Sequence, residues 1–235
     1  MMRPSLRALC LALIVFCTFF SGACKKREQE QRKIFIEFLE AQLIAATDAD
    51  SDEMSDAMRK RVGSFGRHFD VIVMHSRELD EINERLASEK AQIADYGPIP
   101  MDRIGSERAR IEQLVAALSR SLQALDVVRT KAHAAKAALE QPEDVRTVFD
   151  RVYAKKISEY AAASQARYAV QRDFYAEALR MSELLEKHKD AIQFADKRVT
   201  IDDPVLLNKY NVLQKSLQEK FQIMQAPLAS KSPAH

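Results

Sequence analysis

The fold is decided by residues 106–139, SERARIEQLVAALSRSLQALDVVRTKAHAAKAAL. Ile111, Leu118 and Leu125 recur there every seven residues, and Leu114 occupies the second apolar position of the same repeat. A seven-residue apolar repeat predicts a long helix that buries one narrow stripe against neighbouring helices. With a rise of 1.5 Å per residue, about 34 residues of helix extend ~50 Å. This segment therefore favours a helical bundle with coiled-coil-like packing.

Similar apolar spacing extends over most of the chain. Ile72, Leu79, Leu86 and Ile93 repeat every seven residues, with His75 and Ile82 at the second position between them. Serine and aspartate at the segment boundaries are typical helix N-caps, so Ser51 or Asp52 and Ser106 are predicted to start helices. We predict helices over residues 28–47, 51–61, 65–95, 106–139 and 142–187, and a last one that begins at Pro204.

The period changes near the C-terminal end. Ile192 and Phe194, then Val199 and Ile201, alternate around Asp196-Lys197. This alternation predicts a small β-hairpin or two extended pieces. The expected fold is mainly α, an elongated antiparallel helical bundle. Residues 28–225 are expected to form a single helical domain and residues 226–235 a disordered tail.

The N-terminal residues have the pattern of a secretory signal. Arg3 and Arg7 precede an apolar run over residues 8–20, and Ser21-Gly22-Ala23 leads into Cys24. Signal peptidases recognise small residues before the cleavage site. We expect residues 1–23 to be the signal peptide of a lipoprotein, and residues 24–27 to be anchor and tether, with lipid on Cys24. The alternative is an uncleaved membrane anchor, but the run is shorter than the ~20 residues that span hydrocarbon.

Removal of this segment balances the charge. The chain has 36 Lys+Arg and 34 Asp+Glu, and Arg3 and Arg7 leave with the signal, so 34 of each sign remain. A neutral chain of mixed charge gives no support for a nucleic-acid partner. Cys10 and Cys17 leave as well, which excludes a disulfide within the mature chain.

A run of basic residues follows the lipid site. Beside an acylated Cys24, these side chains would reach anionic headgroups, each contributing at most ~1 kcal/mol. The alternative is an ordinary solvated charge run. The candidates for contact with a membrane surface are Lys25, Lys26, Arg27, Arg32 and Lys33.

The sequence offers little catalytic chemistry. It contains no G-x-G-x-x-G, P-loop, H-E-x-x-H, G-x-S-x-G or S-x-x-K motif. His68 and His75 lie seven residues apart, so their rings start ~10 Å apart on a helix, too far to share one metal ion. We expect His68 to face solvent and a carboxylate or water to satisfy His75. No catalytic, cofactor or metal residue is predicted.

Two weaker groups remain open. Acidic neighbours such as Asp80 and Glu81, or Asp202 and Asp203, could act as acid and base, although Asp202 and Asp203 are better explained as a helix cap. Tyrosines recur every seven or eight residues and are predicted to form either a recognition face or the rim of a core. These are Tyr153, Tyr160, Tyr168 and Tyr175.

Three segments together carry a resemblance to a known family. They are QRKIFIEFL at 31–39, AHAAKAALEQPEDVRTVFDRVYAK at 132–155 and NKYNVL at 208–213, downstream of the lipoprotein-type signal. With them the chain resembles the YiaF-like family of bacterial lipoproteins, a family of unknown function. The resemblance implies a helical fold and an envelope location, and it carries over no active-site residue.

The resemblance also bears on the anchor. Members of the family end their signal in Leu-Ser-Gly-Cys, whereas this chain has Ser21-Gly22-Ala23-Cys24. In Gram-negative bacteria an aspartate after the lipidated cysteine retains a lipoprotein at the inner membrane, and Lys25 occupies that place. The expected address is therefore the inner leaflet of the outer membrane, facing the periplasm.

Three kinds of function fit this sequence. The leading expectation is a non-enzymatic envelope lipoprotein that binds another envelope protein or itself through its helical surface. The second is a periplasmic module that holds a lipid or other small ligand inside the bundle. The third is an envelope enzyme.

Overall fold

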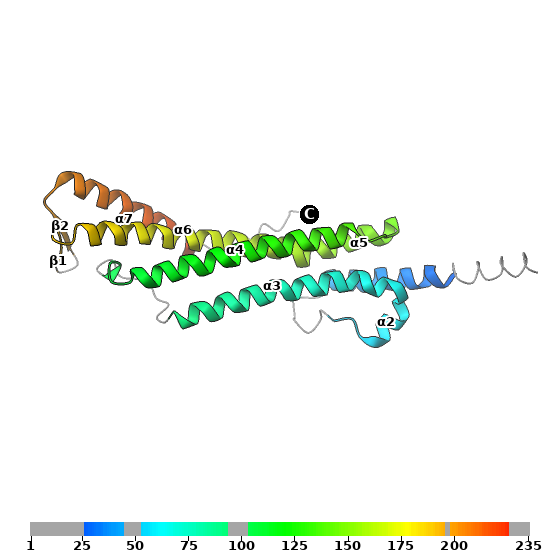
Figure 1. Cartoon of the computed structure of the whole chain (residues 1–235). Helices are drawn as coiled ribbons and strands as arrows, with labels where there is room; N and C mark the ends of the chain where they lie inside the picture. Colours follow the sequence, from blue (N-terminus) through cyan, green and yellow to red (C-terminus); the bar gives the residue numbers. More distant parts are fainter. Residues whose placement is uncertain (1–25, 45–52, 94–102, 196–197, 226–235) are drawn as a thin grey trace, which may run out of the picture. The chain divides into compact units, whose positions relative to one another are not determined.

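The computed structural model describes residues 26–44, 53–93, 103–195 and 198–225 (Figure 1). These residues form two compact units. The first consists of the residues up to Met74 together with Ala132–Ile157, and the second of His75–Lys131 together with the residues from Ser158 onward. Each unit is thus assembled from segments that are distant in sequence.

The mainly helical fold with one small hairpin is confirmed. The first described helix covers residues 26–44, so residues 26 and 27 of the predicted tether are already helical. The elements that follow are α2 (Asp56–Val62), the short 3₁₀ helix η2 (Gly63–Phe65), α3 (Gly66–Gln92), α4 (Arg108–Ala137), α5 (Glu143–Tyr153), the π-helix η4 (Ala154–Glu159), α6 (Tyr160–Lys187), β1 (Ile192–Ala195), β2 (Arg198–Ile201) and α7 (Pro204–Gln225).

Aromatic packing holds the first unit together. The rings of Phe35 and Phe65 stack with their centroids 5.7 Å apart, which joins helix 26–44 to η2. Phe38 meets Phe69 of α3 edge to face at 4.9 Å. Such ring pairs contribute beyond the area that they bury. Helix 26–44, η2 and the start of α3 therefore share one core.

A close backbone approach accompanies this core. Gly63 adopts φ +61°, a conformation that glycine enters without a Cβ penalty. A Cβ at this position would overlap the side-chain amide of Gln31. Gly63 therefore lets the end of α2 lie directly against helix 26–44.

The π-helix corrects the register of the apolar stripe. Val152 and Ile157 are both buried, although five residues separate them and an α-helix would bring Lys155 or Lys156 to that side. The wider i→i+5 turn takes up the additional residue. It also directs Lys155 Nζ to the carbonyl oxygen of Leu43, to which it donates at 2.6 Å. A cation thus lies at the C-terminal end of helix 26–44, where the helix dipole favours it.

In the second unit, α4 runs antiparallel to both α3 and α6. Arg108 and Arg129 of α4 donate to Glu186 and Gln165 of α6, which fixes their opposite directions. Arg120 pairs with Glu89 of α3. The predicted heptad positions of α3 and α4 in this unit are buried, as expected for a bundle seam. They include Leu79, Ile82, Leu86, Ile111, Leu114, Leu118, Leu125 and Val128.

The hairpin and α7 follow α6, as Figure 1 shows. Strands β1 and β2 are antiparallel, with Phe194 opposite Val199. Asp203 Oδ1 accepts hydrogen bonds from the backbone N–H groups of Val205 and Leu206, at 2.8 and 3.3 Å. The predicted Asp203 cap and the start of α7 at Pro204 are therefore confirmed.

Two helix starts differ from the prediction. Ser55, rather than Ser51 or Asp52, caps α2, because its Oγ accepts from the N–H of Met58. Ser106 does not cap α4, because its hydroxyl donates to the carbonyl of Arg103 and the helix begins two residues later. Predictions for residues 1–25 and the tail 226–235 lie outside the described residues, as do Ser51 and Asp52 themselves.

We predict that Gly63→Ala lowers the free energy of unfolding by about 1–2 kcal/mol, because alanine at positive φ is strained and its Cβ would displace Gln31. Urea unfolding measures the loss. The matched control is Gly66→Ala, whose Cβ would find only ordinary contacts at 3.6 Å or more. Equal stability of the two variants would contradict the close approach at Gly63.

Candidate functional site

The candidate membrane-contacting residues do not share one environment. Lys26, Arg27 and Lys33 are exposed on helix 26–44, and Lys33 pairs with Glu37 at 3.9 Å. Arg32 points elsewhere, because its Nε pairs with Asp144 of α5 at 3.0 Å. This ion pair is the reason why Arg32 does not belong to the same free basic surface. Cys24 and Lys25 lie outside the described residues.

The four tyrosines predicted to form a row differ in how deeply they are buried. Tyr153, Tyr168 and Tyr175 are buried, whereas Tyr160 keeps 39% of its surface exposed. Tyr153 belongs to the first unit, where Lys136 Nζ lies 4.8 Å from its ring centroid. Three of the four rings thus lie in cores, as the core alternative predicted, and Tyr160 alone of the row presents a large aromatic surface to solvent.

A polar network joins α3 to α6 within the second unit. The hydroxyl of Tyr168 donates to Asn83 Oδ1, and Asn83 Nδ2 donates to the hydroxyl of Tyr160 at 2.5 Å. Tyr160 in turn donates to Asp80 Oδ1 at 2.9 Å. Burial, and next the hydrogen bond to the Asp80 carboxylate, raises the pKa of Tyr160 to about 12. Both tyrosines therefore act as neutral donors at physiological pH.

Lys90 lies further along the same pair of helices. Its Nζ donates to Gln171 Oε1 at 2.5 Å and lies 5.9 Å from the ring centroid of Tyr168. Burial, and then repulsion from Arg167, lowers the pKa of Lys90 to about 8. The neutral amine is therefore accessible close to physiological pH.

The histidines have structural roles. His75 is 2% exposed and its Nδ1 lies 2.8 Å from Glu78 Oε2, as expected for a seam histidine satisfied by a carboxylate. His68 is not solvent-facing as predicted, because its ring packs edge-on against Phe35 and Phe65 and bonds to Gln141. Among the described residues no group of three or more metal-ligating side chains comes together.

Two of the four acidic candidates make hydrogen bonds within the fold. Asp80 accepts from Tyr160, and Asp203 caps α7. Sequence reasoning missed Asn83 and Lys90, because helical periodicity does not tell which polar residues of two helices will meet.

The last helix presents a second apolar row. Only Leu206, Tyr210 and Leu217 are buried on α7. Val205, Val212 and Ile223 are 63%, 61% and 57% exposed. They are separated by seven and eleven residues, close to two and three helical turns, so they share one face about 120° from the buried one. The seven-residue step from Val205 was the signal in the sequence that a second face exists.

None of the helices in the described ranges combines the length and apolar character needed to cross a bilayer.

A family model for proteins of unknown function, DUF3053, matches residues 10–231. The chain belongs to this family. It is 21% identical to the uncharacterized protein YiaF of Escherichia coli K12 over 212 residues, which cover 90% of this chain and 89% of YiaF. YiaF of Shigella flexneri matches to the same extent. The resemblance seen in the sequence is thus confirmed at the level of the family. No solved structure matches the chain.

We predict that Tyr168→Phe costs about 1–2 kcal/mol of unfolding free energy, because the half-buried Asn83 loses its donor inside the protein. Tyr160→Phe is the matched control and should cost less, since the exposed Asp80 and Asn83 Nδ2 can turn to water. Chemical denaturation of both variants checks the order. A larger loss in Tyr160→Phe would contradict the network as described.

Lys90 predicts a pH effect on stability. Its pKa is about 8 in the folded protein against 10.5 for a free lysine, so between these values the unfolded chain binds more protons and stability rises with pH. We expect the unfolding free energy to increase more in the native protein than in Lys90→Met between about pH 7.5 and about pH 9.5. Parallel urea-unfolding profiles would show that Lys90 titrates normally.

Proposed function

We propose that this protein is a cell-envelope lipoprotein, anchored through acylated Cys24, that has a structural or protein-interaction role rather than a catalytic one. The lone cysteine after small residues supports the anchor. Lys25 rather than aspartate after Cys24 favours the inner leaflet of the outer membrane, facing the periplasm.

The observation that carries the interaction role is the exposed row on α7. Three aliphatic side chains, Val205, Val212 and Ile223, are each more than half exposed on one helix face. Between Val205 and Ile223 the helix makes five turns, so the row extends for about 27 Å. An apolar row of this length matches the helix-in-groove mode, in which anchors at whole-turn spacing enter a partner. The proposed partner is another envelope protein or a second copy of this chain.

The contacts inside the second unit support a scaffold in preference to an enzyme. Of the four carboxylates that a two-carboxylate mechanism could use, Asp80 bonds to Tyr160 and Asp203 caps α7, so one member of each pair has a role in the fold. His75 is 2% exposed, so its ring has little access to a substrate in solution. The competing roles, a ligand-binding module and an envelope enzyme, remain separate outcomes of the experiment below.

The interaction is tested by cross-linking the tagged protein in cells and identifying co-purified proteins by mass spectrometry. We expect a specific partner, or a cross-linked dimer, that is lost in the double variant Val212→Asp/Ile223→Asp, because two charges would enter an apolar contact. The matched control is Asn211→Asp/Gln218→Asp, which places the same charges on exposed positions of a third face of α7, about 120° from the row.

The outcomes separate the three roles. Retention of the partner in Val212→Asp/Ile223→Asp would remove α7 as the binding face. Co-purified lipid or small molecule without a protein would favour the ligand-binding module. Turnover of a co-purified small molecule by the native protein would favour the enzyme.

The anchor is tested separately by feeding cells labelled palmitate. We expect label on the native protein and none on Cys24→Ala, and we expect the native protein to fractionate with the outer membrane. An unlabelled native protein that fractionates with the soluble periplasm would refute the lipid anchor.

A further inference from the structure

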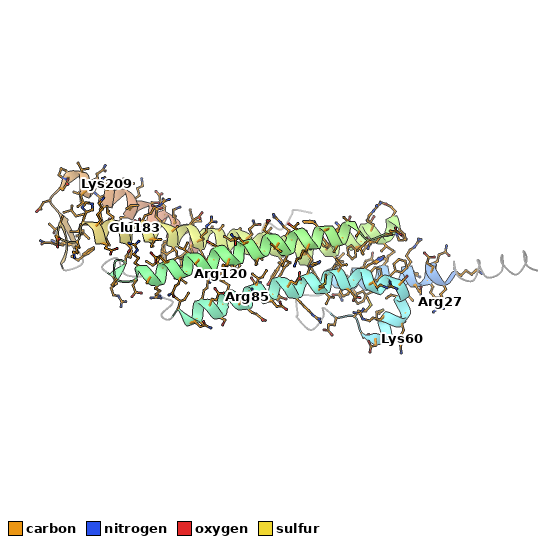
Figure 2. The ribbon with its side chains drawn as sticks, viewed as in Figure 1. Arg27, Lys60, Arg85, Arg120, Glu183 and Lys209 are labelled. Atoms are coloured by element: carbon orange, nitrogen blue, oxygen red, sulfur yellow. The ribbon has the colours of Figure 1, made fainter. Side chains whose placement is uncertain are left out.

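The first unit carries a basic surface that is built from two elements, and only one of them lies next to Cys24 in sequence. Arg27 lies four residues before Gln31 on helix 26–44, so the two side chains share a face. Gln31 is the residue against which Gly63 lies. Lys60 lies three residues before Gly63, in the last turn of α2. Figure 2 shows Arg27 and Lys60 at the same end of this unit.

The three basic residues of α2 differ in whether they form an ion pair. Arg59 turns toward α3, where its guanidinium pairs with Asp70 at 2.7 Å. Lys60 and Arg61 are exposed, and no carboxylate among the described residues pairs with either of them. Lys26 and Arg27 at the start of helix 26–44 are exposed as well, so the first unit has four solvated cations on these two elements. Glu28, Glu30 and Asp56 are also exposed nearby and offset part of this charge.

We propose that Lys26, Arg27, Lys60 and Arg61 form one anionic-lipid contact surface that sets which face of the first unit lies on the membrane. This inference rests on the proposed lipid anchor. Helix 26–44 begins two residues after Cys24, a distance of at most about 7 Å of extended chain. The start of the helix is therefore held at the headgroups, and Lys60 and Arg61 come with it because Gly63 and Phe65 fix α2 and η2 on the same helix.

The acyl anchor and the four cations contribute differently to the contact with the membrane. An acyl anchor supplies the affinity, so four exposed cations need not bind a membrane by themselves. Their attraction to an anionic surface acts within about a Debye length and is reduced by salt. Its consequence is orientation: α2 and the start of helix 26–44 face the lipid. Arg32 takes no part, because Asp144 holds it on the α5 side of the helix.

The test uses the absence of tryptophan from the chain. Ser64 is exposed in η2, beside Lys60 and Arg61, so Ser64→Trp places a single fluorescent reporter inside the surface. The purified full-length mature protein is titrated with vesicles that contain phosphatidylglycerol and with vesicles of phosphatidylcholine alone. We expect a larger blue shift and stronger quenching by brominated lipid with the anionic vesicles than with phosphatidylcholine, and loss of this difference at high salt.

Two comparisons make the test specific. Adding Lys60→Ala/Arg61→Ala to Ser64→Trp should remove most of the blue shift, whereas Lys215→Ala/Lys220→Ala on α7 should leave it unchanged. A shift that survives Lys60→Ala/Arg61→Ala would overturn the proposal.

The result is independent of the partner experiment on α7 and of palmitate labelling. If Cys24 carries no lipid, labelling reports it directly, while the vesicle titration still reports whether the basic surface prefers anionic lipid. Binding of an acidic protein that is lost in Lys60→Ala/Arg61→Ala, with no response to either kind of vesicle, would replace the lipid by a protein partner.

Discussion

Burial of a narrow apolar seam along the helices is the constraint on which the second unit depends. Leu79 and Leu86 on α3, and Leu118 and Leu125 on α4, are at most 2% exposed. Full burial of such a side chain contributes about 1.5–3 kcal/mol, far more than a surface ion pair, which contributes about 1 kcal/mol or less. The exposed pairs along these helices, such as Arg120 with Glu89, therefore adjust a packing that the leucines establish.

An apolar seam alone defines the pairing of helices poorly, because a shift by one heptad places leucine on leucine again. Polar contacts that exist in only one register remove this ambiguity. Tyr168 reaches Asn83, and Asn83 reaches Tyr160, only in the observed alignment of α3 and α6. A shift would leave a buried hydroxyl without a partner, at a cost similar to that of a lost core contact. The network thus contributes alignment, and the leucines contribute stability.

The features that the sequence predicts well are local. The seam, the hairpin around Asp196-Lys197 and the Asp203 cap each depend on residues within one or two turns of each other. The π-helix was missed because a single α-helical period was assumed across it, although the five-residue step from Val152 to Ile157 marks the extra residue. The Asn83 network and the diversion of Arg32 to Asp144 join distant segments, and no periodicity contains that information.

The two apolar rows of α7 cannot both be explained by packing within the second unit. Leu206, Tyr210 and Leu217 suffice to cover α6, and they leave the row of Val205, Val212 and Ile223 in water. An exposed aliphatic residue is ordinary when it stands alone, whereas these three share one helix face, although Lys209, Ser216 and Glu219 lie between them on that face. Polar residues at these positions would serve a helix that only had to pack on α6. The exposed row is therefore the feature of α7 that the proposed contact outside the unit would explain, and it lies on the helix farthest in sequence from Cys24.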